Sequence, residues 1–249
     1  MSSYEKFMKN KTRISVIIPA YNEEKRIKKT LSNYVQYFSE KYNSDFEILV
    51  MTDGCTDRTV KIVEEFNKKF SRIKCHNYQK RLGKGGAIIE GFRKVKGEIV
   101  TYIDADGATK PDELDRLIEE LKGCDVVIAS RYMDGSNIDA NQPFTRLIAS
   151  KGFNFLVRHL FNIPYRDTQC GAKVLKNHVV KDIISDLTER QWAFDVDLLW
   201  TATKKGYKIR EAPITWKHEE DSKLKLYKVI PQMLFAILRL KFKTRGRLN

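Results

Sequence analysis

The amino-acid sequence predicts an α/β protein in which helices flank a mostly parallel central sheet. Short apolar segments alternate with longer amphipathic segments along most of the chain, as strands alternate with helices in such proteins. The 249 residues suffice for one domain with a substantial core. Asp53, Asp104 and Asp106 directly follow predicted strands. Ligands of parallel sheets bind beyond the carboxyl ends of the strands, so these carboxylates are predicted to meet one ligand.

The predicted strands of the first half are apolar runs bounded by charged or turn-forming residues. The run "RISVIIPA" begins the series, and the third run, "IKCHNY", is the least apolar. The predicted strands cover 13–20, 46–52, 73–78, 98–103 and 125–130.

Helices are predicted between these strands because apolar residues recur every three or four positions. Asn22 is a candidate N-cap for the first helix and Thr56 for the second. Pro111 stands near the start of the fourth, where a missing N–H costs nothing. The predicted helices cover 23–40, the stretch that follows the turn at 53–59, 85–95 and 111–121.

The pattern changes after residue 131. Residues 132–142 are predicted to form a polar loop, 143–161 a long amphipathic helix, 172–175 a short strand, 195–204 a helix and 207–216 a late strand. No internal repeat or low-complexity linker divides the chain. The predicted organisation is therefore an N-terminal extension (1–12), one domain (13–222) and a C-terminal segment (223–249).

The C-terminal segment combines many apolar residues with a basic end. The final eleven residues contain five cations and no acid, and the whole chain has a net charge of +14. A wide apolar stripe next to a basic cluster predicts an amphipathic helix at a membrane interface. A C-terminal helix that docks on the core is the alternative, and a lysine-rich solubilising surface would also account for the charge.

Targeting and cysteine patterns predict a cytoplasmic protein, peripheral on the cytoplasmic face of a membrane. The N-terminal "MSSYEKFMKNKTR" lacks the apolar region of a secretory signal. No window approaches the ~20 apolar residues of a spanning helix. The four cysteines are spread singly, which argues against a zinc site and against a disulfide framework.

The aspartate pair in "TYIDADGATKPDEL" is the first chemical feature. The two-residue period of a strand places Asp104 and Asp106 on the same side, where both can reach one Mg²⁺ or Mn²⁺ ion that also binds a diphosphate. An aspartate turn followed by a helix cap is the plain structural alternative. The glycines of "KRLGKGGA" allow the backbone to approach a phosphate, and Lys84 adds positive charge. The spacing excludes a P-loop.

Taken together and in order, the motifs resemble family 2 glycosyltransferases. "IPAYNEE", "DGCTDRT", "GKGGA" and "DADGATKPDEL" carry the general resemblance, and "DTQCGAKVL", "QWAFDVDLL" and "EAPITWKHEEDSK" are similar to the dolichyl-phosphate glucosyltransferase branch and to dolichyl-phosphate mannose synthases. The resemblance covers residues 13–240. It implies the GT-A nucleotide-sugar-binding fold and a metal-dependent enzyme of protein glycosylation.

The resemblance also implies roles for individual residues. The positions it assigns to the nucleotide sugar are Pro19, Tyr21, Glu23, Asp53, Lys84, Asp104, Asp167, Gln169 and Lys223. The positions it assigns to the acceptor phosphate are Arg131, Arg146 and Ser150. Asp106 matches the metal ligand, for Mg²⁺ or Mn²⁺, and is expected to act in catalysis with the two arginines. Three departures from the family pattern stand at Cys55, Lys217–His218 and Asp221.

The implied reaction is inverting transfer of glucose or N-acetylglucosamine from a UDP-sugar to dolichyl or polyprenyl phosphate. A phosphate oxygen is already anionic near neutral pH, so this acceptor needs no general base. Transfer to a hydroxyl acceptor is one alternative, and it would need a base such as Asp167 or Asp197. A nucleotidyltransferase would be expected to carry an N-terminal glycine-rich loop with an arginine, which the chain lacks. A non-enzymatic basic protein that binds membranes would explain the charge but not the carboxylates, and a nucleic-acid partner is not expected.

Overall fold

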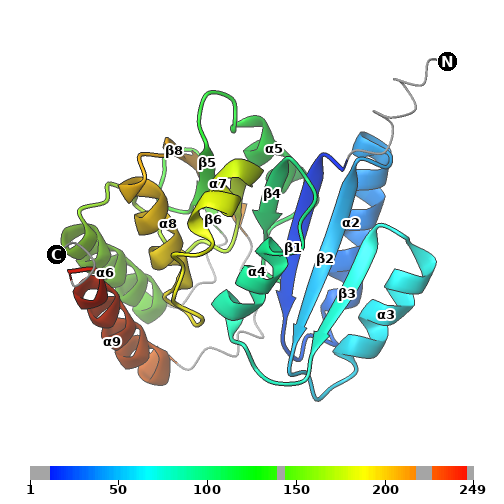
Figure 1. The fold of residues 1–249 in the computed structure, drawn as a ribbon, viewed down its shortest axis with the longest axis horizontal. Helices are drawn as coiled ribbons and strands as arrows, with labels where there is room; N and C mark the ends of the chain where they lie inside the picture. The colour runs from blue at the N-terminus through cyan, green and yellow to red at the C-terminus, as the bar shows by residue number, and fades with distance from the viewer. Residues whose placement is uncertain (1–11, 139–143, 217–225, 246–249) are drawn as a thin grey trace.

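The computed structural model describes residues 12–138, 144–216 and 226–245 (Figure 1). The first half of the chain contains β1 (Ile14–Ala20), α2 (Ile27–Tyr42), β2 (Phe46–Asp53), α3 (Thr59–Lys69), β3 (Ile73–Tyr78), α4 (Lys84–Phe92), β4 (Ile99–Tyr102), α5 (Pro111–Glu119) and β5 (Val126–Ser130). The second half contains β6 (Asn137–Ile138), α6 (Phe144–Phe161), β7 (Lys173–Lys176), α7 (Asn177–Ile183), α8 (Phe194–Lys204), β8 (Ile209–Pro213), β9 (Thr215–Trp216) and α9 (Leu226–Arg245).

The central sheet has seven strands in the order β3-β2-β1-β4-β7-β5-β8. All neighbouring pairs are parallel except those of β7, which runs antiparallel to β4 and β5. The prediction of a mostly parallel sheet is therefore confirmed. The parallel strands β1, β2 and β4 end at one edge, and this edge carries the predicted aspartates.

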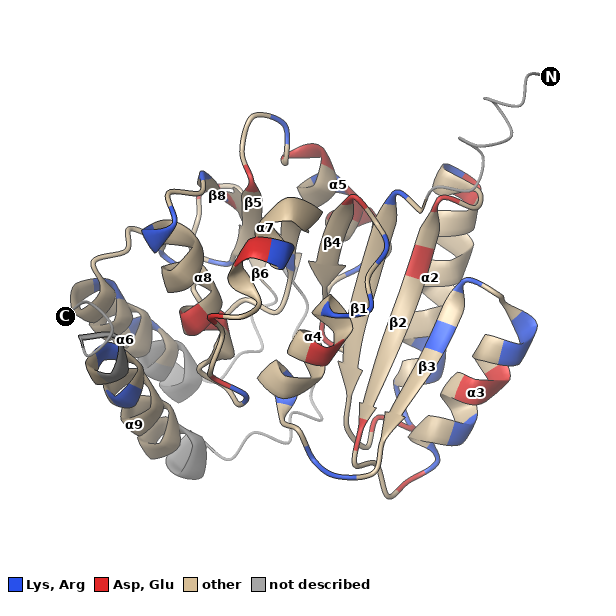
Figure 2. Ribbon diagram, in the orientation of Figure 1, with Lys and Arg blue, Asp and Glu red and all other residues tan. Residues whose placement is uncertain are grey.

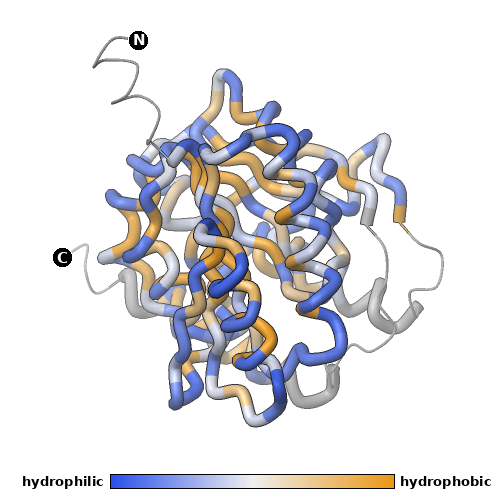
Figure 3. Tube along the Cα trace, turned by 90° about the vertical axis from the view of Figure 1, so that its right-hand side faces the viewer, coloured by the Kyte–Doolittle hydropathy of each residue, from blue (hydrophilic) through white to orange (hydrophobic). Residues whose placement is uncertain are grey.

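Helices cover both faces of the sheet, and each face has its own apolar core. In β1, Val16 and Ile18 belong to the core beneath α2, α3 and α5, whereas Ile17 belongs to the core beneath α4 and α6 to α9. All eight residues of β2 are buried, while the edge strand β3 is largely accessible, which explains why β3 is the less apolar run. In Figure 3 the hydrophobic segments accordingly lie mainly inside the molecule.

The first loops differ from the prediction because polar side chains bind across them. The first helix begins at Ile27, not at residue 23. Asn22 has a left-handed φ of 53°, and its Oδ1 accepts the backbone N–H of Thr56 at 2.8 Å. The two residues that were predicted to cap separate helices therefore connect the loops that follow β1 and β2.

Three short elements of the second half were not predicted. Residues 207–216, expected to be one strand, form β8 and β9. β9 pairs in parallel with β6, which falls inside the expected polar loop. α7 follows β7 directly and was also missed.

Helix α9 packs against α6 at one end of the molecule (Figure 1). Its Ile237 and Leu240 are 0% and 2% exposed, and Arg239 forms an ion pair with Glu189. One face of the C-terminal helix is thus docked on the core, as the alternative to the membrane prediction required. No helix in the described parts of the chain is long and apolar enough to cross a bilayer.

The docked face of α9 can be tested with two neighbouring residues. Ile237→Ala should lower the free energy of unfolding by about 2–4 kcal/mol, because it leaves a cavity where the side chain is buried. Leu238→Ala, the matched control on the accessible face, should change it by less than about 1 kcal/mol. Urea unfolding followed by circular dichroism measures both values, and equal effects of the two substitutions would contradict the docking.

Candidate active site

Asp53, the last residue of β2, holds the glycine-rich loop. Its carboxylate accepts the backbone N–H of Gly83 at 3.0 Å and also that of Leu82, and it pairs with Arg81 at 3.2 Å. The Arg81 guanidinium in turn lies 3.4 Å from the centre of the Tyr21 ring. The structure therefore joins two residues that were predicted to contact the nucleotide, Asp53 and Tyr21, through a third that was not.

The glycines of this loop are required by close packing. A Cβ on Gly83 would lie 2.5 Å from the Arg190 carbonyl oxygen, and one on Gly85 would lie 2.4 Å from the Phe194 side chain. Gly83 also has a left-handed φ of 83°. The loop is thus clamped between Asp53 and residues 189–194, and α4 begins at Lys84 in a set position.

Lys84 points to the aspartate pair. Its Nζ lies 2.6 Å from Asp104 Oδ1. Burial alone would lower the pKa of Lys84, but the charges of Asp104 and Asp195 outweigh it and raise that pKa above its usual value. The lysine is therefore a permanent cation at the strand edge.

Asp106 is left with unbalanced negative charge. Burial, and next the charge of Asp104, raise the pKa of Asp106 to about 6, although the backbone N–H of Ala108 donates to its Oδ1 at 3.0 Å. A divalent cation would relieve this repulsion, and it commonly takes one or two carboxylates plus phosphate oxygens. The described residues contain no group of three or more metal-ligating side chains. The aspartate pair thus fits a cation that takes its remaining ligands from a diphosphate and water.

The "DTQCG" segment lies directly against Asp104. A Cβ on Gly171 would lie 2.0 Å from Asp104 Oδ2, so only glycine fits there. Gln169 donates from its amide nitrogen to the Trp192 carbonyl at 3.2 Å, which ties the same segment to the residues that clamp the glycine-rich loop.

A buried charge network beneath this segment was missed by the sequence analysis. Asp195 Oδ1 accepts from the Tyr102 hydroxyl and from Lys173 Nζ, each at 2.6 Å. Lys173 is 0% exposed and also donates to the Cys170 carbonyl at 2.8 Å. The network links the end of β4 to β7 and α8. Its only signal in the sequence was one lysine inside an apolar strand.

Arg131 and Asp167 were assigned to different ligands, and the structure pairs them with each other. Arg131 Nε lies 2.7 Å from Asp167 Oδ2, and Nη2 lies 3.0 Å from Oδ1. Burial alone would raise the pKa of Asp167, but the Arg131 charge and its hydrogen bonds hold that pKa below its usual value. This two-pronged ion pair places the guanidinium at the end of β5.

Helix α6 reaches the same region. The Ser150 hydroxyl oxygen accepts from the Tyr132 hydroxyl at 2.8 Å, and Asn154 Oδ1 accepts the backbone N–H of Thr168 at 2.9 Å. Arg146 precedes Ser150 by one turn of α6, and its side chain lies outside the described residues, as does Lys223. The structure therefore brings Ser150 near Arg131 and Asp167 through Tyr132 and Thr168.

The remaining predicted residues lie at the end of β1. Pro19 belongs to β1. Glu23 accepts from Arg26 Nε at 2.8 Å, and its backbone N–H donates to Thr59 Oγ1 at 2.7 Å. Pro19 thus lies near the end of β1 and Glu23 follows this strand, at the same edge of the sheet as Asp53.

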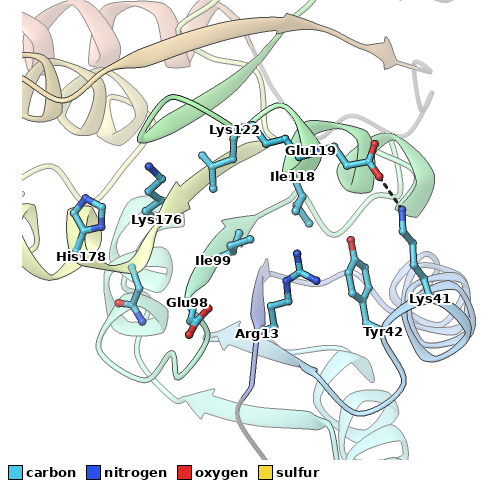
Figure 4. A pocket seen from close by; sticks show the side chains of 12 residues that line it. Arg13, Lys41, Tyr42, Glu98, Ile99, Ile118, Glu119, Lys122, Lys176 and His178 are labelled. Atoms are coloured by element: carbon cyan, nitrogen blue, oxygen red, sulfur yellow. Dashed lines mark hydrogen bonds and ion pairs between the residues drawn. The ribbon is translucent and has the colours of Figure 1, made fainter. Parts of the chain in front are cut away.

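A pocket at the opposite edge contains none of the predicted residues (Figure 4). Arg13 and Ile99, at the amino ends of β1 and β4, are among the side chains that line it. Its Lys41 forms an ion pair with Glu119 at 3.1 Å, and Lys176 pairs with Asp125 at 3.1 Å. The predicted site residues in the described part of the chain therefore do not line this pocket.

A family model and known relatives match most of the chain. Residues 15–184 match the family model described as glycosyl transferase family 2. The chain is 32% identical over 244 residues to a dolichyl-phosphate beta-glucosyltransferase of Trichomonas vaginalis, covering 94% of this chain and 74% of the relative. It is also 32% identical over 232 residues to the dolichyl-phosphate beta-glucosyltransferase of Saccharomyces cerevisiae, covering 86% of this chain and 69% of the relative.

Solved structures share the fold. The glucosyl-3-phosphoglycerate synthase of Mycobacterium tuberculosis, solved with Mn²⁺, UDP-glucose and phosphoglyceric acid, superimposes with a TM-score of 0.68 at 17% identity, covering 92% of this chain and 80% of the other. At this identity the likeness concerns the fold alone.

The contact between Gly171 and Asp104 predicts the effect of one added methyl group. Gly171→Ala should displace Asp104 and weaken binding of UDP in the presence of Mn²⁺ by about tenfold or more, because the Lys84–Asp104 pair is then disturbed. Isothermal titration calorimetry measures the affinity. Gly152→Ala in α6 is the control, because a Cβ there meets nothing within 4 Å. Unchanged UDP affinity in Gly171→Ala would contradict the inference.

The raised pKa of Asp106 predicts a pH-dependent gain in stability when its charge is removed. Between pH ~4, the pKa of an unfolded aspartate, and pH ~6, the folded state binds more protons at this residue, so its contribution to stability falls as the pH rises. Asp106→Asn should therefore raise the free energy of unfolding by about 1–3 kcal/mol at pH 8 in the presence of EDTA, and by less at pH 5. Urea unfolding at both pH values measures this, and a gain that is independent of pH would count against the charge repulsion.

Proposed function

Because the chain belongs to glycosyl transferase family 2, we propose that it transfers glucose from UDP-glucose to dolichyl or a related polyprenyl phosphate. The observation that carries the proposal is the identity of 32% over 94% of the chain to a dolichyl-phosphate beta-glucosyltransferase. The names of such relatives favour glucose over N-acetylglucosamine, which the sequence analysis left open. The GT-A fold of the family agrees with the sheet order and with the site at the strand ends.

The donor is proposed to lie along the edge formed by β1, β2 and β4. Tyr21 is 39% exposed and stands ready to stack on a base, and Asp53 fixes the loop from which Lys84 projects. Asp106, with Asp104 beside it, is proposed to hold Mg²⁺ or Mn²⁺, which when bound would supply positive charge to the leaving diphosphate. Lys84 adds a second positive charge at the same place, since its own pKa keeps it protonated.

The acceptor is proposed to be a phosphate and not a hydroxyl group. The two candidate bases for a hydroxyl acceptor are both occupied: Asp167 by Arg131, and Asp197 by the backbone N–H groups of Thr188 and Glu189 at 2.7 and 2.9 Å. A phosphate oxygen needs no base, but it must be brought next to a second anion. Arg131 is proposed to supply charge for this step, together with Arg146 and Ser150 on α6. Inversion at the sugar follows from direct attack.

The place of action follows from the acceptor. A polyprenyl phosphate resides in a bilayer, so the enzyme is proposed to work as a peripheral protein on the cytoplasmic face, where UDP-sugars are met. A membrane-binding protein without enzymatic activity would not account for the arrangement of Lys84, Asp104 and Asp106 at the strand edge.

The proposal is tested by incubation with UDP-glucose, dolichyl phosphate and Mn²⁺, with mass spectrometry of the lipid product. We expect glucosyl-phospholipid, and Asp106→Ala should lower the rate by about a hundredfold or more. Asp112→Ala, an exposed acid at the start of α5, is the matched control and should retain the wild-type rate. If UDP-N-acetylglucosamine is used as a donor and UDP-glucose is not, the proposed sugar is wrong. If the sugar is transferred to a hydroxyl acceptor but not to the lipid phosphate, the proposal of a phosphate acceptor is refuted.

A further inference from the structure

Exposed aromatic and aliphatic side chains gather on α6 and α9. Phe155 on α6 is 62% exposed, and Phe235, Leu238 and Phe242 on α9 are 68%, 44% and 64% exposed. Among the described side chains, Tyr21 at the candidate active site is the only other large hydrophobic side chain that is exposed. Because α6 and α9 pack against each other, exposed apolar side chains on both helices indicate an interaction surface. We call these four residues with the exposed cations beside them the α6–α9 face.

The geometry of α9 holds this face outward. Phe235, Leu238 and Phe242 are spaced i, i+3 and i+7, so they share one side of the helix. Ile237 and Leu240 occupy the other side and are buried against the core. The three exposed side chains are therefore presented by a docked helix and not by a loose one.

The charges of the two helices all have one sign. Neither α6 nor α9 contains an aspartate or glutamate, although the chain has 32 of them. Lys151 and Arg158 on α6 are exposed, and Arg239 on α9 is accessible while paired with Glu189. Figure 2 shows blue bands but no red ones on the described parts of α6 and α9. A face that combines apolar side chains with cations alone complements an anionic, partly apolar surface.

We propose that the α6–α9 face docks on the surface of a bilayer that contains anionic phospholipid. Phe155, Phe235 and Phe242 enter the boundary between headgroups and acyl chains, and the cations bind the headgroups. A second copy of the chain is the poorer occupant, since two such faces would bring cations against cations.

Helix α6 connects this docking to the candidate active site. Asn154, which accepts from the backbone N–H of Thr168 at 2.9 Å, is the immediate neighbour of the exposed Phe155. One helix thus has one side in the site and the other in the proposed interface. This part of the inference rests on the proposed function. If the acceptor is a lipid phosphate, docking through α6 would bring that phosphate from the membrane surface to Ser150 and Arg131, and the enzyme would not have to extract the lipid.

The docking itself is tested without any sugar substrate. Wild-type protein is sedimented with vesicles of phosphatidylcholine, either alone or with about one part in four phosphatidylserine. We expect binding that is strengthened by the anionic lipid. The double variant Phe235→Ser/Phe242→Ser should bind about tenfold or more weakly with an unchanged melting temperature, because both side chains are exposed in the folded protein.

Charge is tested with a matched pair of variants. Lys151→Gln/Arg158→Gln should weaken binding to the anionic vesicles by about fivefold per cation. Lys61→Gln/Lys68→Gln on α3, where both lysines are exposed at the other end of the molecule (Figure 1), should leave it near wild type. Equal effects of the two pairs would show attraction by net charge alone and would overturn the proposal.

Three other outcomes separate the possibilities. Absence of vesicle binding by the wild type, or binding unchanged in the double phenylalanine variant, overturns the docking face. A dimer in analytical ultracentrifugation that the phenylalanine variant loses would assign the face to a second copy instead. If vesicles bind as expected but no glucose reaches detergent-dispersed dolichyl phosphate, the proposed function fails while the docking face stands.

Discussion

The ion pair between Lys84 and Asp104 is the interaction on which the candidate site depends. Lys84 stands where it does because Asp53 and residues 189–194 clamp the glycine-rich loop. Asp104 stands where it does because Gly171 leaves room for its carboxylate. The ion pair neutralises the negative charge of Asp104 but not that of Asp106, whose pKa is raised by burial and by the charge of Asp104. One carboxylate is thus neutralised by the protein, and the other is left for a cation.

Charge is also divided between two regions of the molecule. The carboxylates of Asp53, Asp104 and Asp106 lie at the carboxyl edge of the sheet, where they are proposed to meet a cation and a nucleotide diphosphate. Cations without acids lie on α6 and α9, at the end of the molecule far from α3 (Figure 2). The proposed reaction, with a dissolved donor and an acceptor in a membrane, needs these two environments close together. Helix α6 joins them, through Asn154 on one side and Phe155 on the other.

Strand β2, which is buried on both faces, was predicted almost to the residue, because most of its positions are apolar: the prediction 46–52 became Phe46–Asp53. The edge strand β3 was predicted at its exact bounds, 73–78, although it is largely accessible. The start of α2 was misplaced by four residues because Asn22, a strong capping residue, is used instead to bind Thr56 across two loops. β6 was missed, and β9 was predicted only as the end of one strand over 207–216, because two residues give no periodicity and their pairing joins segments far apart in the chain.

The sequence by itself determined the order of the elements and the motif residues that meet at the strand edge, because both follow from local periodicity and from the common direction of parallel strands. Only the tertiary structure decided which charged residues form ion pairs with each other. Arg131 binds Asp167, and Lys173 binds Asp195, because β7 enters the sheet antiparallel between β4 and β5 and draws its flanking segments into the site. The sequence around a charged residue does not show with which residue it forms an ion pair. The partner is chosen by which strands become neighbours, since a buried charge must find its counter-charge within reach of the folded backbone.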